Sequence, residues 1–418
     1  MRNTDDSIVI TGMGLASPIG LFPSEAIARL LGGETGIAAG DGEQVFARAA
    51  VPRYELSGVR NAKNQKFLNA GSRHLMWSAL RALEQSGWSR EAFAADRMAV
   101  FTGSGQVGME PNLLFPGFKI VQTPEGEGDW AAVGGPAARA LDIYFPLRTL
   151  SNSGLALLAM EMGARGPSNN YVQSDTAGVI ALEAAMDALR AGECDLAVCG
   201  TYENLVSAAN YLNFRRAGIL TEPPVRPFDR EANGTVIGEA GAAIVLERKS
   251  SAAARGARIL GEVAGLATAM NGEDRAGPIG SGGAVKAAIR GALGDAKPDL
   301  VVLGGAAVPS QDGAEAAAVE GALGPGRIPC TAFKGATGYV GAATAVVEMV
   351  LALAALEAHQ APPVTGLQTP ADGIALDLVR TRPRDLNGHH QPLSALCLSH
   401  SLMGQSAAVL LRHGGDCN

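Results

Sequence analysis

The chain has few residues of the kinds that bind metals or form disulfide bonds. Its 418 residues include five cysteines and six histidines, with no CxxC spacing. The cysteines are odd in number and lie mostly in apolar segments, so we expect reduced core residues of a cytosolic protein: Cys194, Cys199, Cys330, Cys397 and Cys417. His389 and His390 lie in a polar loop typical of a surface. The sequence therefore predicts no metal site, and it indicates no other cofactor.

Long apolar runs and excess positive charge are also missing. No run approaches the roughly 20 residues of a membrane span, and Met349–Leu356 predicts a short buried helix. The polar start of the chain does not resemble a signal peptide, so we expect a cytoplasmic protein without a membrane partner. The net charge of −7 argues against nucleic acid as the main partner. One local basic cluster is either a solvated face or a site for an acidic carrier protein: Arg53, Arg60, Lys63, Lys66 and Arg73.

The segment Gly166–Gly178 shows the pattern of a strand-to-helix elbow. Asn170–Ser174 is a short extended run, Asp175–Gly178 predicts a tight turn, and Val179–Arg190 has a helical pattern. Many α/β enzymes place a nucleophile at such an elbow, because the free N–H groups of the first helical turn stabilise negative charge. The residue at the tip here is Asp175, whose simplest interpretation is a helix N-cap.

Two glycine-rich segments do not fit nucleotide-binding motifs. The strand Ile8–Thr11 runs into Gly12-Met-Gly14, which predicts a turn, but a dinucleotide site would need a third glycine and an acidic residue further on. The segment Gly234–Ala243 lacks the Lys-Ser/Thr pair of a phosphate loop. We therefore expect tight turns beside an active-site floor rather than a phosphate site.

Together these segments resemble the β-ketoacyl synthases of fatty acid and polyketide synthesis, which have the thiolase-like fold. The similarity is carried by GPS…DTAGVIAL…ALRAGECDLAVCG in residues 166–200, by the opening GMG, and by RPFD followed by GEAGA in residues 226–242. Counting from either end of the first segment places Asp175 at the nucleophilic cysteine of that family.

The second half of the chain weakly repeats the first. Ile259–Gly265 mirrors Ile8–Gly14, Leu300–Leu303 with Gly304-Gly305 mirrors Val100–Gly105, and an elbow-like turn and helix follow residue 328. This predicts an α/β protein with two central sheets and a shared helix layer. The resemblance implies the five-layered αβαβα architecture, built from two pseudo-repeated halves, residues 1–250 and 251–418, in one intertwined unit.

The resemblance also implies a catalytic triad, and all three of its positions differ here. The family holds the acyl chain on a cysteine and uses two histidines; this chain has Asp175, Gly304 and Tyr339 there, while Lys334 and Glu348 match the family. In the gating loop after His400, which includes Leu402, Gly404 alone is retained. A carboxylate is a poor nucleophile toward thioesters, so we expect no condensation by this chain alone.

Three functions fit this pattern. The first is a non-catalytic partner subunit resembling the chain-length factors of type II polyketide synthases, which pairs with an active ketosynthase. The resemblance then places five side chains at the acyl tunnel or dimer interface, where ordinary packing is the alternative: Met109, Leu113, Leu114, Phe115 and Phe118.

The second function is a repurposed acyltransferase or hydrolase, in which a lysine-lowered Tyr339 or a Lys334–Asp175 pair acts as general base. The simpler alternative is a structural ion pair between Lys334 and Asp175. The third function is a homodimer that binds an acyl carrier protein without chemistry. In each case we expect a dimer, because Asn169–Ser174 predicts an edge strand that the family pairs across a two-fold axis.

Overall fold

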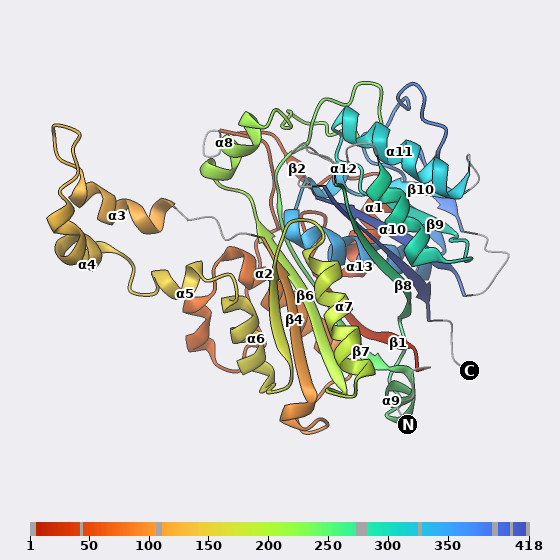
Figure 1. Cartoon of the computed structure of the whole chain (residues 1–418), viewed down its shortest axis with the longest axis horizontal. Coiled ribbons are helices and arrows are strands. Elements are labelled where there is room, and N and C mark those ends of the chain that lie inside the picture. The colour runs from red at the N-terminus through yellow and green to blue at the C-terminus, as the bar shows by residue number, and fades with distance from the viewer. Residues whose placement is uncertain are drawn as a thin grey trace.

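The strands fall into two groups with the same internal order (Figure 1). The computed structural model describes residues 6–41, 45–105, 111–272, 282–324, 328–386, 392–401 and 404–414. The first group runs β1 (Ile8–Ala16), β7 (Glu239–Arg248), β6 (Leu196–Asn204), β4 (Met98–Ser104), β5 (Ser168–Val172). The second runs β8 (Gly261–Met270), β15 (Gln405–His413), β14 (Ser394–His400), β9 (Leu300–Leu303), β10 (Pro329–Ala332), with the two-residue β12 (Asp377–Leu378) at its edge.

The two groups also share their strand directions. In each, the third and fourth strands and the fourth and fifth strands pair in parallel, whereas the second and third form an antiparallel pair. A short contact joins the groups, in which Val9 pairs with Glu262 and Ile10 with Gly261. Hydrogen bonding therefore runs continuously through 11 strands. The two groups nevertheless form two layers, because the helix α13 (Thr344–Glu357) packs between them, on β7 of the first and β14 of the second.

Helices form three layers around the two sheets. Between the sheets lie α7 (Ala177–Arg190), which packs on β4 and β6, and α13 (Thr344–Glu357), which packs on β7 and β14. The outer face of the first sheet is covered by α2 (Ala70–Gln85) and α6 (Ser153–Met162), and that of the second by α10 (Gly283–Leu293), with α11 (Pro309–Leu323) packed against it. The architecture is the five-layered αβαβα thiolase-like fold, as the sequence predicted.

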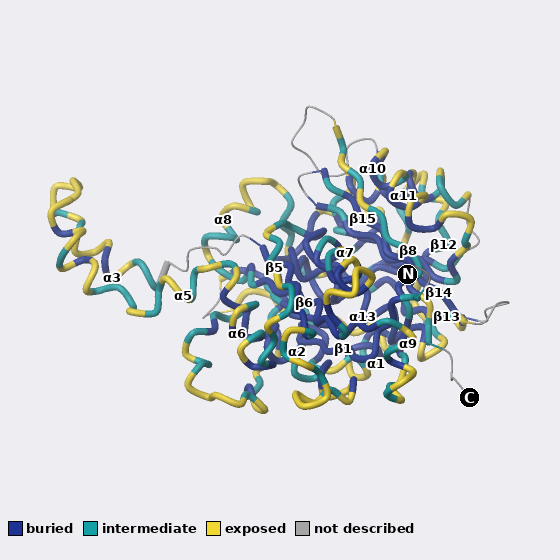
Figure 2. Tube along the Cα trace, turned by 60° about the horizontal axis from the view of Figure 1, so that its bottom comes forward, coloured by how far each residue is buried: buried dark blue, intermediate teal, exposed yellow. Residues whose placement is uncertain are grey.

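The apolar segment around residue 350 forms the central helix α13, which is buried along almost its whole length. Every residue from Thr344 to Leu356 is buried, because sheets cover it from both sides (Figure 2). The expected buried helix over Met349–Leu356 is thus confirmed, although it starts five residues earlier, at Thr344. A helix that is apolar on all sides is stable only in such a fully enclosed layer.

The glycines of the opening strand do not form a turn, and that prediction was wrong. β1 continues through Gly12 and Gly14 to Ala16. A Cβ at Gly12 would lie 2.0 Å from the carbonyl oxygen of Ala82, and one at Gly14 would lie 1.9 Å from that of Ser78. Both glycines therefore allow α2 to pack directly on the strand backbone.

The elbow differs from its prediction in two respects: the helix begins two residues earlier than predicted, and Asp175 is not its cap. β5 is the edge strand of its sheet, as expected, and α7 begins at Ala177 with Thr176 in the N-cap position. Asp175 is thus not the cap, and the N-cap interpretation was wrong. Its side chain turns instead into the interior, where it is fully buried.

Residues 111–150 form an arm that stands out from the body (Figure 1). The arm contains α3 (Pro111–Val121), η3 (Trp130–Ala132), η4 (Val133–Ala137), α4 (Ala138–Ala140) and α5 (Phe145–Thr149). The sequence before residue 129 showed little periodicity, so the helix α3 was not predicted. Contacts at the base of the arm fix it to the body: the Lys66 ammonium donates to the Tyr144 hydroxyl at 2.9 Å, and Arg148 donates to the Lys66 carbonyl.

Shorter elements connect these layers and cover their ends. They are α1 (Pro23–Leu31), β2 (Ile37–Ala38), β3 (Arg48–Ala49), η1 (Ala62–Phe67), η2 (Ala95–Arg97), α8 (Ala208–Arg216), α9 (Lys249–Ala254), α12 (Lys334–Thr337), η5 (Gly341–Ala343), β11 (Gln360–Ala361) and β13 (Arg384–Asp385). Four cysteines are free and buried, as predicted, while Cys417, His389 and His390 lie outside the described residues. In the part of the chain that is described, no helix combines the length and apolarity needed to cross a bilayer.

Candidate functional site

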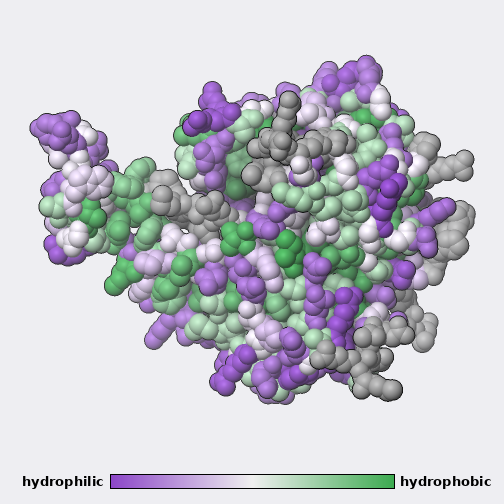
Figure 3. All heavy atoms as spheres, in the orientation of Figure 1, coloured by the Kyte–Doolittle hydropathy of each residue, from purple (hydrophilic) through white to green (hydrophobic). Residues whose placement is uncertain are grey.

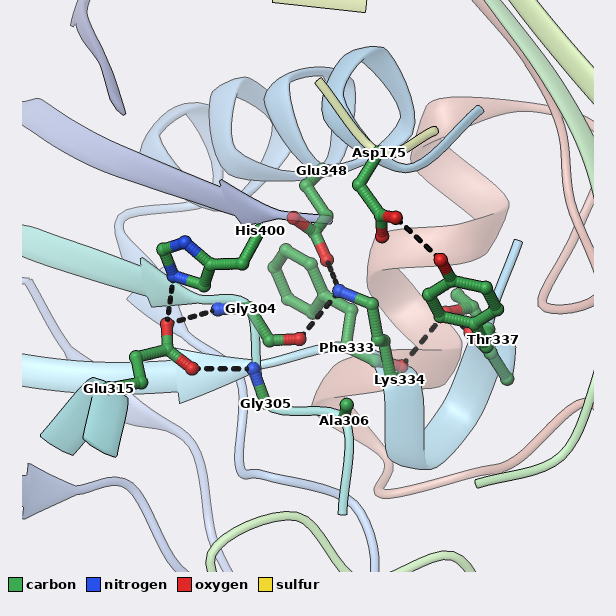
Figure 4. A network of polar contacts seen from close by, with 12 residues as sticks. Asp175, Gly304, Gly305, Ala306, Glu315, Phe333, Lys334, Thr337, Glu348 and His400 are labelled. Carbon is green, nitrogen blue, oxygen red and sulfur yellow. Dashed lines mark hydrogen bonds and ion pairs between the residues drawn. The ribbon is translucent and has the colours of Figure 1, made fainter. Parts of the chain in front are cut away.

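The three substituted positions of the family motif come together in the interior (Figure 4). Asp175 comes from the β5–α7 elbow and Gly304 from the end of β9. Tyr339 lies in the turn after α12. Lys334 at the start of α12 and His400 at the end of β14 line the same cavity. The ends of five elements thus meet where the two halves of the chain face each other.

Asp175 is held by two hydroxyl groups. Tyr339 Oη and Ser174 Oγ both donate to its Oδ2, at 2.6 and 2.7 Å, and the two hydroxyls lie 3.1 Å apart. The other carboxyl oxygen, Oδ1, has no hydrogen-bond partner among the described residues. Burial raises the pKa of Asp175, although the nearby charge of Lys334 and these hydrogen bonds oppose the rise.

Tyr339 acts as a neutral hydrogen-bond donor. Burial raises its pKa well above the usual value, and the neighbouring Asp175 raises it further. The hypothesis of a lysine-lowered tyrosine acting as a base was therefore wrong, because the phenolate is disfavoured here. The backbone N–H of Tyr339 donates to the carbonyl of Val236 at 2.7 Å, which fixes the ring on the glycine-rich segment near residue 235.

The buried cation Lys334 pairs with Glu348 on α13. Its Nζ lies 2.9 Å from Glu348 Oε1 and donates to the Gly304 carbonyl at 2.5 Å. The expected ion pair between Lys334 and Asp175 was wrong, since Lys334 pairs with Glu348 instead and its charge acts on Asp175 only at longer range. Burial opposes the charge of Lys334, but Glu348 and Asp175 outweigh it and raise its pKa, whereas burial raises the pKa of Glu348 to about 7.

A second buried carboxylate organises the loop after β9. Glu315 on α11 accepts hydrogen bonds from the backbone N–H groups of Gly304 and Gly305, at 2.6 and 2.9 Å. His400 Nε2 lies 3.0 Å from the same carboxylate. Burial alone would raise the pKa of Glu315, but His400 and these donors lower it, so Glu315 is the acceptor and His400 Nε2 the donor.

Asp312 connects the same loop to the RPFD segment. Its carboxyl group accepts from the backbone N–H groups of Phe228 and Ala306, at 2.7 and 2.9 Å. Burial raises its pKa to about 7, against the effect of these two donors. Asp312 thus holds the loop after β9 to the backbone at Phe228.

The space left between these side chains is small. The cavity lined by Asp175, Lys334, Tyr339 and His400 has a volume of about 10 Å³. A single water molecule needs roughly 10–15 Å³ on this measure. The pocket in this conformation therefore has room for at most one water, and an acyl thioester would require side chains to move.

The structure does not bring the proposed tunnel residues to this pocket. Leu113 and Leu114 are partly buried in α3, while Phe115 and Phe118 are 52% and 58% exposed on the arm. Met109 and Leu402 lie outside the described residues. Gly404, in the gating loop, has a φ of 85°, a conformation that favours glycine, and its N–H donates to the Ser401 carbonyl at 3.1 Å.

Sequence reasoning missed two partners in the pocket. The sequence placed Ser174 only at the end of an extended run, yet its hydroxyl donates to Asp175. Glu315 was not considered, although it lies three residues after Asp312 and hence on the same face of α11. No cluster of three or more metal-ligating side chains occurs among the residues described.

The fold and the composition of this pocket define a thiolase-like condensing-enzyme scaffold. Family models agree with this assignment. The β-ketoacyl synthase N-terminal domain matches residues 5–252, and the C-terminal domain matches residues 260–368. The chain therefore belongs to the β-ketoacyl synthase family.

Individual relatives cover nearly the whole chain. The tetracenomycin polyketide synthase ketoacyl synthase beta subunit of Streptomyces glaucescens is 28% identical over 97% of this chain and 98% of its own length. The structure of the ishigamide ketosynthase/chain length factor superposes with a TM-score of 0.84 at 24% identity, covering 98% of this chain and 100% of the other. A type II polyketide synthase acyl-carrier protein in complex with its ketosynthase, AntDE:AntF, gives a TM-score of 0.81 at 22% identity, covering 98% and 99%.

Proposed function

We propose that this chain is a non-catalytic subunit that resembles a chain-length factor and pairs with an active ketosynthase. The observation that carries the proposal is the state of position 175. In place of a thiol there is a buried carboxyl group, held by Tyr339 and Ser174, beside a cavity of about 10 Å³. This arrangement has neither a thiolate to accept an acyl chain nor the space to bind one.

Two further features support a partner. The relative from Streptomyces glaucescens is named a ketoacyl synthase beta subunit, and it aligns along nearly its full length. In addition, eight of the 14 large apolar side chains that are exposed in the described part of the chain lie on the arm (Phe115, Phe118, Ile120, Trp130, Val133, Ile143, Leu147 and Leu150). Figure 3 shows apolar residues along this arm where it leaves the body.

An apolar projection of this kind is a protein-interaction surface. The base of the arm, α5, packs on α6, which also contacts the edge strand β5. The free backbone groups of β5 would pair across a two-fold axis in the family's dimer. We infer that the arm and β5 form the interface with the ketosynthase. The tunnel assigned to Leu113, Leu114, Phe115 and Phe118, and also to Met109, would then form in the complex.

Co-expression with a ketosynthase from the same organism tests this proposal. We expect the two chains to co-purify as a 1:1 complex and Phe118→Asp to weaken the complex at least tenfold, because it places a charge in an apolar interface. Leu212→Asp is the matched control, since Leu212 on α8 is 57% exposed, close to the 58% of Phe118. Equal effects of the two substitutions would contradict the interface.

The same experiment separates the alternatives. A stable homodimer that ignores the ketosynthase but binds an acyl carrier protein would favour a non-catalytic carrier-binding scaffold. Turnover by the isolated chain, lost in Asp175→Asn, would favour a repurposed acyltransferase or hydrolase. In both cases the proposed partnership with a ketosynthase would be wrong.

A further inference from the structure

Two positions at strand ends, Gly304 after β9 and His400 at the end of β14, lie so close together in the pocket that only one of them has room for a side chain. A Cβ built on Gly304 would lie 2.8 Å from His400 Cδ2 and 3.4 Å from its Nε2. Real Cβ atoms essentially never approach another heavy atom within 3.0 Å. The first atom of any side chain at position 304 would therefore clash with the imidazole of His400, so that the ring or the loop would have to move.

The imidazole is firmly oriented in this place. Its side chain is 5% exposed, and Nε2 donates to Glu315, which also binds the N–H groups of Gly304 and Gly305. The other ring nitrogen, Nδ1, has no hydrogen-bond partner among the described residues, and it points away from Glu315 (Figure 4). One carboxylate thus holds both the ring and the backbone of the loop after β9.

The effect of this contact reaches the rest of the cluster. The Gly304 carbonyl accepts from Lys334 Nζ, which in turn pairs with Glu348. His400 is therefore connected through Glu315 and the Gly304 backbone to the buried cation next to Asp175. Moving the ring would disturb the loop that positions Lys334.

We propose that His400 supplies from β14 the imidazole that a residue at position 304 would otherwise supply from β9, and that it closes the pocket. In this role His400 is a positioning residue: it fills the side-chain volume of position 304 and holds the β9 loop through Glu315. The proposal rests on the proposed function in one respect, since it explains how a subunit without condensation chemistry keeps this pocket closed. The clash between a side chain at position 304 and the ring of His400 does not depend on any partner protein.

A swap of the two residues tests the exclusion. We expect Gly304→His to be destabilised because its Cβ meets the His400 ring, and His400→Gly to be destabilised because Glu315 loses its partner. The double variant, Gly304→His with His400→Gly, returns an imidazole to the same volume and should be more stable than either single variant. We expect non-additivity on the order of tenfold in the unfolding equilibrium constant. Additive effects of the two substitutions would overturn the proposal.

A matched glycine controls for the substitution itself. A Cβ on Gly313, in the helix α11, would meet nothing within 4 Å. Gly313→Ala should therefore leave the protein at least as stable as the parent, because alanine favours a helix over glycine, while Gly304→Ala should lower its stability measurably. If Gly304→Ala is also neutral, the ring does not occupy the volume as we infer.

Two further measurements keep the proposal testable if a swap variant folds poorly. In His400→Gly, free imidazole should bind the vacated space and raise the melting temperature, with no such rise in the parent protein. In Asp175→Cys, the new thiol should react with iodoacetamide at least tenfold more slowly than in Asp175→Cys with His400→Gly, as measured on the peptide that contains residue 175. Absence of the imidazole effect would overturn the volume argument, and equal alkylation rates would overturn the closure of the pocket.

Discussion

Replacing Lys334 by methionine tests whether the buried cation is part of the structure rather than of a reaction. Lys334 and Glu348 are each 2% exposed, and 2.9 Å separates Nζ from Oε1. Methionine keeps most of the side-chain volume but removes the donor, so the Gly304 carbonyl and Glu348 lose their partner. Removing one member of a buried ion pair typically costs about 3–5 kcal/mol.

The protonation of Glu348 limits this loss. Its pKa is already about 7 beside Lys334, so without the cation it takes up a proton at neutral pH. We therefore expect Lys334→Met to lose about 3 kcal/mol at pH 7, the lower end of the range. A carboxyl group whose folded pKa is raised stabilises the protein most at low pH, so the loss should be smaller at pH 5 than at pH 8.

Urea unfolding followed by tryptophan fluorescence and circular dichroism, at equal protein concentration, measures the effect. The control is Arg258→Met, because Arg258 lies 2.9 Å from Glu357 but the two side chains are 68% and 43% exposed. That exposed pair should contribute less than about 0.5 kcal/mol. Lys334→Met with Glu348→Leu should recover most of the loss, since no buried carboxyl group is then left without its partner. A loss below about 1 kcal/mol for Lys334→Met would refute the reasoning.

Two other substitutions probe buried features of the fold. Burial raises the pKa of Glu203 to about 7 from 4.5, so the stability that Glu203 contributes is present below pH 4.5 and lost as the pH rises through 7. Relative to the parent protein, Glu203→Gln should therefore be more stable at pH 8 than at pH 4.5, by up to about 3 kcal/mol in the free energy of unfolding. Thermal unfolding at the two pH values measures this difference. An unchanged pH profile would show that Glu203 is ionised without penalty. Gly12→Ala should lower the free energy of unfolding, measured in urea, by about 3 kcal/mol or more, because its Cβ would lie 2.0 Å from the Ala82 carbonyl oxygen. The control is Gly134→Ala, whose Cβ would meet nothing within 4 Å and whose free energy of unfolding should stay within about 0.5 kcal/mol of the parent. Similar effects at the two glycines would contradict the close approach of α2 to β1.

The layered fold was predictable because it follows from local patterns repeated along the chain. The apolar strands, the buried helix near residue 350 and the weak internal repeat each depend on neighbouring residues, and the family motifs agree with them. The glycines of β1 show the limit of such reasoning. Glycine permits both a turn and the close approach of a helix, and only the position of Ala82, 70 residues away in the sequence from Gly12, distinguishes the two.

The pocket was predictable in its positions but not in its contacts. The motifs indicated Asp175, Gly304, Tyr339, Lys334 and Glu348, and the structure brings them together. Their pairing depends on the relative placement of elements far apart in sequence: Tyr339 reaches Asp175 across 164 residues. The position of His400 against Gly304 follows from the pairing of β14 with β9, which no local pattern reveals.

The central claim is that this chain does not carry the acyl group itself. Intact-mass analysis tests it most directly, with the chain alone and in complex with a ketosynthase from the same organism, each incubated with acyl- and malonyl-loaded carrier protein. We predict that the mass of this chain stays unchanged in both samples and that product forms only when the ketosynthase is present. Acylation of this chain, or product formed by it alone, would contradict the account.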